Sequence, residues 1–238
     1  MTPCAVSPLG LRRPARPTAS ALLLLAAVLG VSVGGGSLQA AAQPDPTARA
    51  QDALEATALS VARAFDERLT IWQGPDGTRT YAGHCRTAPG GCRTRIALFS
   101  QLIARISRQQ DVDPFLVAAV VLRESGLNPF AEGGVGERGI VQLHPQGAGR
   151  DVEFVQSEPY RQRCRSAPDT CQGEVLRVGI TLLADSIRRC GDIEAGLGMY
   201  NGGTCESTSY SRRVLSERSR LLELAKRGSH DDARHGSH

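Results

Sequence analysis

The chain has 238 residues, a hydrophobic content of 41% and a formal net charge of +4. This length and apolar content indicate one domain of moderate size with flanking segments and enough apolar surface for a buried core. Three arginines, Arg12, Arg13 and Arg16, precede an apolar run, so the rest of the chain carries a net charge of about +1. A nucleic-acid-binding surface would require a basic stripe, and this charge balance excludes one.

Residues 1–42 have the three parts of a secretory signal peptide. An apolar run over residues 21–33 follows the arginines, and Ala40-Ala41-Ala42 provides the small residues of a cleavage site. The run is shorter than the roughly 20 residues that a membrane-spanning helix needs. We therefore expect a bacterial protein exported to the periplasm or the extracellular space, with an uncleaved membrane anchor as the alternative.

Six cysteines lie outside this leader, and an even number of cysteines in an exported chain predicts disulfides. They are Cys85, Cys92, Cys164, Cys171, Cys190 and Cys205. The segments 85–92 and 164–171 are near copies of each other, because each has an Ala-Pro turn between two cysteines. We predict that each segment closes its own small loop, which leaves Cys190 to pair with Cys205. A zinc site is the alternative, and the absence of any Cys-x-x-Cys pair disfavours it.

Hydrophobic periodicity predicts an all-α chain with no convincing strand. Residues 43–47 are a polar linker, residues 48–69 an amphipathic helix, and residues 72–92 a loop rich in Gly, Pro and Thr. Residues 228–238 have the composition of a disordered tail. Further helices are expected at 95–108, 174–189, 193–200 and 210–227.

The helix that follows Asp113 is the most informative element. Asp113 is a favourable N-cap, Pro114 suits the first helical position, and Gly126 provides a stop. Residues 115–122 are apolar on every side, which predicts a buried helix. Glu124 lies where this helix ends, and both burial and the negative end of the helix dipole should disfavour its charge. A carboxyl group that keeps its proton near neutral pH can act as a general acid, whereas an ion pair with an arginine is the structural alternative.

Three segments, in order and spacing, resemble the soluble lytic transglycosylase family, whose fold is like that of goose-type lysozyme. They are Glu124-Ser125-Gly126-Leu127-Asn128-Pro129, Gly139-Ile140-Val141-Gln142-Leu143-His144-Pro145 and Tyr200-Asn201-Gly202-Gly203. The resemblance covers about residues 95–216. It implies an all-α, lysozyme-like catalytic domain over residues 85–227 with a substrate cleft. The N-terminal extension at 43–84 and the Cys164–Cys171 insert look like additions to the family pattern, and the three predicted disulfides should staple the loops.

The resemblance implies that Glu124 is the single acid/base of an enzyme that cleaves peptidoglycan. Such a glutamate protonates the oxygen of the β-1,4 bond between N-acetylmuramic acid and N-acetylglucosamine. The muramoyl C6 hydroxyl then returns a proton to the glutamate and attacks C1, which gives a 1,6-anhydro end without any metal or cofactor.

The other motif residues receive their expected roles from the same resemblance. Gln142 is expected at the cleft wall, where its amide can bind a sugar N-acetyl group or, alternatively, brace the loop. The Tyr200 hydroxyl is expected to approach the catalytic carboxyl, while Tyr210 matches a later family tyrosine to which we assign no role. Asn201 should hold the turn after its short helix, and Ser125 should help to fix the helix end.

The chain departs from the family pattern ahead of the glutamine motif, where Gly133 replaces a common serine and Glu137 introduces a second acid. A second carboxylate across the cleft could activate water and make the enzyme a lysozyme-like hydrolase. An ion pair of Glu137 with Arg138 or Arg123 is the alternative.

A third hypothesis is a non-catalytic glycan-binding or assembly factor in which Glu124 is structural. Under each hypothesis the expected partner is the peptidoglycan glycan strand, bound by a monomer. Because the family often serves secretion or conjugation machines, an envelope or secretion-machine partner is also compatible with this chain, although no sequence feature specifies one.

Overall fold

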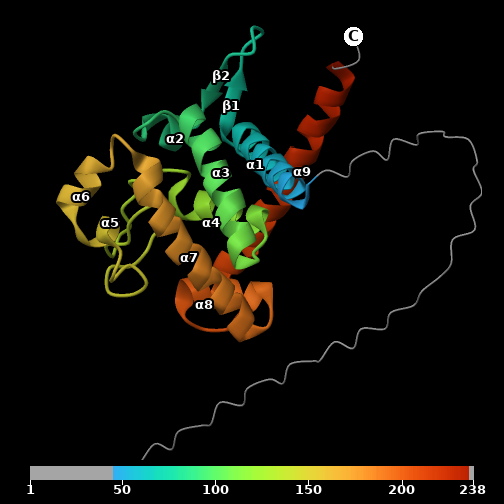
Figure 1. Cartoon of the computed structure of the whole chain (residues 1–238). Helices are drawn as coiled ribbons and strands as arrows, with labels where there is room; N and C mark the ends of the chain where they lie inside the picture. Colours follow the sequence, from blue (N-terminus) through green and yellow to red (C-terminus); the bar gives the residue numbers. More distant parts are fainter. Residues whose placement is uncertain (1–44, 236–238) are drawn as a thin grey trace, which may run out of the picture. The chain divides into compact units, whose positions relative to one another are not determined.

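The computed structural model describes residues 45–235, and the predicted signal peptide lies outside them. The described residues are mainly helical, which confirms the predicted all-α class. Helix α1 (Pro46–Leu69) packs against both α3 (Cys92–Gln110) and α9 (Ser209–His235), as Figure 1 shows. Helix α1 begins inside the expected linker, because the Asp45 side chain accepts a hydrogen bond from the backbone N–H of Thr47 and Pro46 occupies the first helical position.

Helix α4 (Pro114–Ser125) is buried against α3 and α9. Helix α4 begins after the N-cap residue and ends at the glycine that the sequence predicted. The Asp113 carboxylate accepts a 2.9 Å hydrogen bond from the backbone N–H of Phe115, and Gly126 ends the helix with a φ of 60°. Asp113 also forms an ion pair with Arg218 of α9. The start of α4 is therefore tied to a helix that comes about a hundred residues later.

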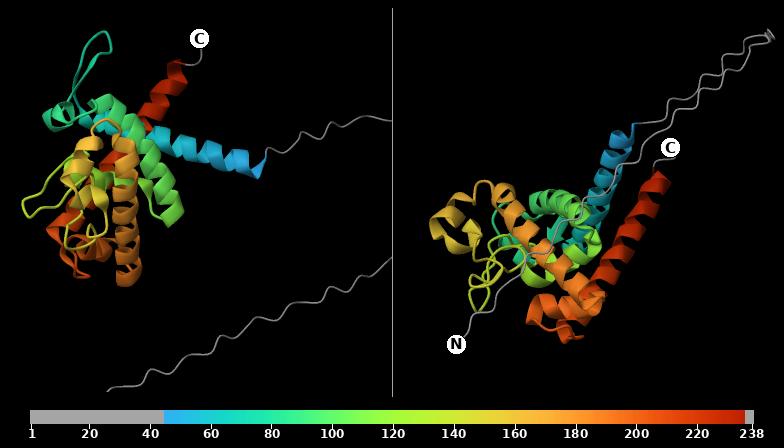
Figure 2. Two further views of the ribbon diagram at one scale, coloured as in Figure 1. Left: turned by 60° about the vertical axis from the view of Figure 1, so that its left-hand side comes forward. Right: turned by 60° about the horizontal axis from the view of Figure 1, so that its bottom comes forward.

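Helices α7 (Pro168–Cys190) and α8 (Ile193–Gly202) pack closely on each other, and α7 also packs on α3 (Figure 2). A β-carbon on Gly196 would lie 2.6 Å from the Cα atom of Ile187, so the two helices approach through the glycine. Helix α7 begins at Pro168, six residues before the predicted start at 174, since proline is well suited to the first turn.

A short antiparallel hairpin, β1 (Thr70–Gln73) and β2 (Arg79–Tyr81), projects from the end of α1 (Figure 1). The sequence did not predict it, nor the short helix α2 (Gly83–Thr87), since residues 72–92 were expected to be a loop. Strands of four and three residues are too short for periodicity to detect. The turn Asp76-Gly77, with a φ of 81° at the glycine, was the available signal.

All three predicted disulfides are present, namely Cys85–Cys92, Cys164–Cys171 and Cys190–Cys205. Disulfides persist in oxidising compartments, so they indicate an exported protein. Within residues 45–235, no helix has the length and apolar character required to cross a membrane.

Two further short helices, α5 (Glu153–Gln156) and α6 (Glu158–Arg163), precede the second disulfide. At the C-terminal end, α9 continues through residues 228–235, which the sequence assigned to a disordered tail. No proline interrupts this segment, so the helix propagates to His235.

Candidate active site

Glu124 lies in the last turn of α4, half-buried, on the wall of a cleft with a volume of about 500 Å³. The cleft brings together residues from all three motif segments. Its lining residues are Glu124, Gly133, Gly134, Glu137, Val141, Gln142, Leu143, His144, Ala148, Leu182, Tyr200 and Asn201. The fold therefore brings three motifs that are distant in the sequence together in a single concave site.

The pKa of Glu124 is raised above its ordinary value, as the sequence predicted. Burial of the carboxyl group is the largest cause, and the charge of Glu137 acts in the same direction. A hydrogen bond from Tyr210 and the charge of Arg123 oppose the shift. A carboxyl group with this balance holds its proton to a higher pH than a surface glutamate, which suits a general acid.

The tyrosine that contacts the carboxyl group is Tyr210 and not Tyr200. The Tyr210 hydroxyl donates a 2.5 Å hydrogen bond to Glu124 Oε1, whereas the Tyr200 hydroxyl donates to the backbone carbonyl of Val141 at 3.1 Å. Tyr200 still lines the cleft, and its pKa is raised by burial and by the charge of Glu124. Tyr200 thus lies near Glu124, as expected, but its hydroxyl is hydrogen-bonded to the glutamine motif and not to the carboxyl group.

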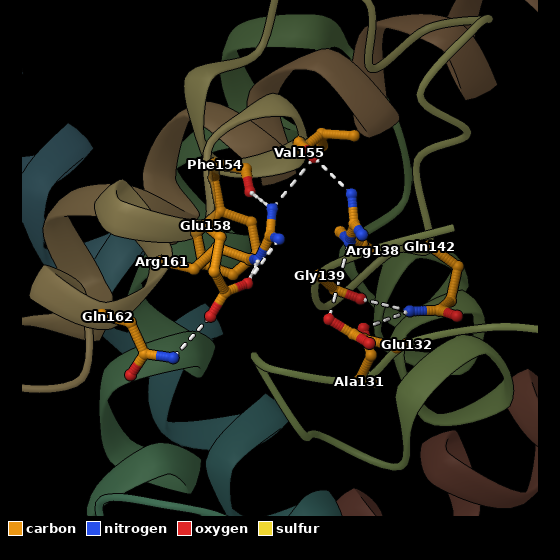
Figure 3. A network of polar contacts seen from close by, with 10 residues as sticks. All are labelled: Ala131, Glu132, Arg138, Gly139, Gln142, Phe154, Val155, Glu158, Arg161 and Gln162. Atoms are coloured by element: carbon orange, nitrogen blue, oxygen red, sulfur yellow. Dashed lines mark hydrogen bonds and ion pairs between the residues drawn. The ribbon is translucent and has the colours of Figure 1, made fainter. Parts of the chain in front are cut away.

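Gln142 lines the cleft in a fixed orientation. Its Nε2 donates to the carbonyls of Gly139 at 2.8 Å and Ala131 at 3.0 Å, as Figure 3 shows. A flipped amide would place its oxygen against two carbonyl oxygens, so only this orientation is favourable. Gln142 therefore braces the loop through its nitrogen and offers only its oxygen to a ligand.

These features agree with the comparisons with known proteins. A model of the family described as "Transglycosylase SLT domain" matches residues 101–221. The chain belongs to this family. A protein named "Transglycosylase" from Enterobacteria phage PRD1 is 35% identical over 121 residues. The match covers 48% of this chain and 41% of the phage protein, so the chain spans less than half of that relative's length.

Ser125 fixes the end of α4 of the SLT domain, as the family pattern suggested. Its hydroxyl lies 3.0 Å from the carbonyl oxygen of Val121 and 2.8 Å from that of Ile140. The second contact joins the glutamate motif to the glutamine motif. Asn201 is exposed and lines the cleft, while the turn after α8 is made by Gly203, with a φ of 78°.

Arg138 joins the loop of the SLT domain between residues 131 and 143 to Val155, which Arg161 also contacts. Arg138 and Arg161 both donate to the carbonyl of Val155, at 2.9 and 3.0 Å (Figure 3). Arg138 also lies 3.5 Å from a carboxylate oxygen of Glu132. None of these contacts involves the Gln142 side chain, which is held by the carbonyls of Ala131 and Gly139.

Gln172 is a positioning residue that the sequence analysis missed. It is fully buried in α7, next to Cys171. Its Nε2 donates to the carbonyl of Pro129 at 2.9 Å, and its Oε1 accepts from the backbone N–H of Ile140 at 3.1 Å. One side chain thus connects the glutamate motif, the glutamine motif and the second disulfide loop. A polar residue in an otherwise buried stretch of a helix was the signal available in the sequence.

Arg95 is a second buried polar residue that joins distant segments around the site. It is 1% exposed, and its guanidinium donates to the carbonyls of Leu127, Ala88 and Pro89 at 3.0, 2.7 and 2.6 Å, and also to that of Cys85. Leu127 has a φ of 68° and follows Gly126, the residue that ends α4. Arg95 therefore fixes the first disulfide loop against the segment that carries Glu124.

Glu137 lies in the cleft, and the alternative of an ion pair with Arg138 or Arg123 is not what the structure shows. Among the described residues, Arg138 pairs with Glu132, and Arg123 has no ion pair. Among the side chains described, no group of three or more His, Cys, Asp or Glu is arranged to hold a metal ion. The site presents carboxyl, amide and hydroxyl groups, which are the groups that acid/base chemistry on a sugar uses.

Proposed function

We propose that the chain is a lytic transglycosylase that cleaves the β-1,4 bond between N-acetylmuramic acid and N-acetylglucosamine in peptidoglycan. The observation that carries the proposal is Glu124, a half-buried carboxyl group with a raised pKa at the wall of the cleft. Family membership and the likeness to a protein named "Transglycosylase" support a glycan substrate.

In the proposed reaction, Glu124 is the only acid/base. Its carboxyl proton moves to the glycosidic oxygen as the bond from that oxygen to C1 of the muramic acid breaks. The C6 hydroxyl of the same sugar then attacks C1, and its proton returns to Glu124. The product ends in 1,6-anhydro-muramic acid, and no water is consumed. The hydrogen bond from Tyr210 to Oε1 leaves Oε2 as the oxygen that carries the proton.

Hydrolysis of the same bond is a second candidate, because Glu137 lines the same cleft as Glu124. In that reaction a second carboxylate would remove a proton from water, which would attack C1 in place of the C6 hydroxyl. Export to the cell envelope would bring either enzyme to its substrate, and the three disulfides fit that location.

Mass spectrometry of the soluble fragments that the mature chain releases from purified peptidoglycan tests the proposal. Glu124→Gln keeps the size of the side chain and removes the proton donor, so it is the matched control. Anhydro ends that disappear in this variant are the expected result. Fragments heavier by one water would identify a hydrolase, and an active Glu124→Gln variant would remove Glu124 from the mechanism.

A further inference from the structure

Gly133 and Glu137 are neighbours on the wall of the cleft, and the Glu137 carboxylate fills the space that a side chain at position 133 would need. A β-carbon on Gly133 would lie 2.3 Å from Glu137 Oε2 and 3.1 Å from Glu137 Cδ. The first distance is shorter than β-carbons show in proteins and the second is tighter than most, so a side chain at position 133 would displace the carboxylate. The two positions are therefore coupled, and the glycine is what allows the Glu137 carboxylate to lie where it does.

The loop that carries both residues holds the carboxylate in this place. The backbone N–H of Gly133 donates to the carbonyl of Glu137 at 2.8 Å, and that of Gly136 donates to the carbonyl of Gly133 at 3.3 Å. The backbone N–H of Val135 donates to Glu137 Oε2 at 3.2 Å. Within the described residues, no group donates to Glu137 Oε1. One carboxylate oxygen is thus anchored, and the other is available to a ligand.

A second acceptor lies beside the carboxylate. Gln142 Oε1 would be 2.9 Å from the same β-carbon position on Gly133, and its amide cannot turn because Nε2 already donates to two carbonyls. Glu137 Oε1 and Gln142 Oε1 are therefore two acceptors that lie close together on this part of the cleft wall. A glycan is rich in donors of the matching kind, namely hydroxyl groups and the N–H of its N-acetyl groups.

We propose that Glu137 is a substrate-binding residue, whose carboxylate, held over Gly133, accepts a hydrogen bond from a hydroxyl or amide N–H of the glycan. Hydrogen bonds to an ionised acceptor are roughly twice as strong as neutral ones, which makes the contact a determinant of affinity. The inference rests on the proposed function for the identity of the glycan.

The charge of Glu137 has a second consequence at Glu124. The charged and titratable groups that influence Glu124 are Tyr210, Arg123 and Glu137, with Tyr200 close to the same carboxyl group. Among them, Glu137 favours the protonated form. Loss of its charge should therefore move the alkaline limb of the kcat/KM profile to lower pH, an effect that a merely structural residue would not have.

Steady-state kinetics on soluble peptidoglycan oligosaccharides test the proposal with a double-mutant cycle. Glu137→Ala should raise KM on the order of tenfold, with a smaller change in kcat. Gly133→Ala should raise KM similarly, because the new β-carbon displaces the carboxylate. The double variant should lose less than the sum of the two single losses, because both changes remove the same carboxylate contact, and only the 2.9 Å approach to Gln142 Oε1 remains as a separate effect of the new β-carbon. Glu137→Gln, which leaves the size of the side chain unchanged, should show the shift of the alkaline limb.

Glu132→Gln is the control, since it removes a negative charge from the same loop at an exposed side chain that does not line the cleft. It should leave KM and the pH profile unchanged. If the increase in KM of the double variant corresponded to the sum of the two single losses in binding free energy, Gly133 and Glu137 would not be coupled. An unchanged KM in Glu137→Ala, or a change from reducing to anhydro products in Glu137→Gln, would overturn the binding role, the latter in favour of water activation.

Calorimetry separates this inference from the proposed function, because binding is measured without turnover. The same oligosaccharide is titrated into Glu124→Gln and into Glu124→Gln/Glu137→Ala. Weaker binding by the second protein supports the inference even if the wild-type chain cleaves nothing. Equal binding by the two proteins rejects the inference even if the wild-type chain releases anhydro fragments.

Discussion

The Tyr210 hydroxyl donates a hydrogen bond to Glu124 Oε1 and so joins α9 to the end of α4 across 86 residues of sequence. Tyr210 is 8% exposed and Glu124 is half-buried, so the contact is largely shielded from solvent. The bond stabilises the charged form of the carboxyl group, while burial destabilises it more strongly. The acidity of Glu124 is therefore set by two opposing effects, one of which a single substitution can remove.

Replacing Tyr210 with phenylalanine should raise the pKa of Glu124 further, because the opposing hydrogen bond is lost. Since the protonated form is the acid in the proposed mechanism, the alkaline limb of the kcat/KM profile should move to higher pH. Turnover at the optimum should fall on the order of tenfold, because the carboxyl group loses its fixed orientation. The pH dependence of fragment release measures both effects.

Tyr160→Phe is the matched control, because the Tyr160 ring packs under Arg163 and, among the described residues, its hydroxyl makes no hydrogen bond. It should leave the profile unchanged. A limb that stays in place or moves to lower pH in Tyr210→Phe would show that this hydroxyl does not control the acidity of Glu124.

Glu124→Gln should make the fold more stable at neutral pH. The pKa of Glu124 is raised above its ordinary value of 4.5, so between the two values the folded chain binds more protons than the unfolded chain. Stability is then complete below the unfolded pKa and falls as the pH rises through the folded pKa. Glutamine does not titrate and avoids this loss, so the variant should melt at a higher temperature at pH 7 but show no advantage below about pH 4.

Calorimetric melting curves from pH 4 to pH 8 measure this difference. In a chain of this size the melting temperature changes by about 2–4 °C for each kcal/mol of stability. Glu55→Gln, at an exposed position of α1, is the control and should show no such pH dependence. A Glu124→Gln variant that is less stable than the wild type at pH 7 would mean that burial does not disfavour the charge of Glu124.

The sequence predicted those features of the fold that depend on residues close together in the chain. The cap at Asp113, the proline that follows it and the stop at Gly126 set the bounds of α4, and each acts within a few residues. The cysteine pairing was predictable for the same reason, because two near-identical loops each close within seven residues.

The features that the sequence did not reveal depend on contacts between distant segments. Nothing local to Tyr200 or Tyr210 indicates which hydroxyl reaches Glu124, because the choice depends on how α8 and α9 pack on α4. The same is true of Gln172, which meets Pro129 and Ile140 only in the folded chain. The hairpin was missed for a different reason, since its strands are short and its Ile71 and Trp72 side chains are exposed.

Reduction of the disulfides should lower the melting temperature. Each bond contributes on the order of 2–4 kcal/mol, and in the chain-entropy account the contribution grows with loop length. Cys190–Cys205 closes a separation of 15 residues, against seven for each of the other two. The paired substitution Cys190→Ala/Cys205→Ala should therefore cost more stability than Cys85→Ala/Cys92→Ala. Melting curves with and without dithiothreitol check this, and an unchanged curve under reductant would contradict it.

Arg95→Met should strongly destabilise the fold. Arg95 is buried, and among residues 45–235 it has no carboxylate partner; its guanidinium donates to the backbone carbonyls of Cys85, Ala88, Pro89 and Leu127. Methionine fills similar space but leaves these acceptors without donors, which should cost about 3 kcal/mol or more. Urea unfolding measures the loss as a fall in the midpoint at an unchanged m-value.

Arg93→Met separates loss of charge from loss of these contacts, because Arg93 is exposed in the same turn of α3. It should change the free energy of unfolding by less than about 0.5 kcal/mol. Because Leu127 follows the helix that carries Glu124, Arg95→Met should also lower kcat under conditions where the variant remains folded. Full activity and wild-type stability in this variant would show that the carbonyls find other donors, and that Arg95 does not hold the glutamate segment in place.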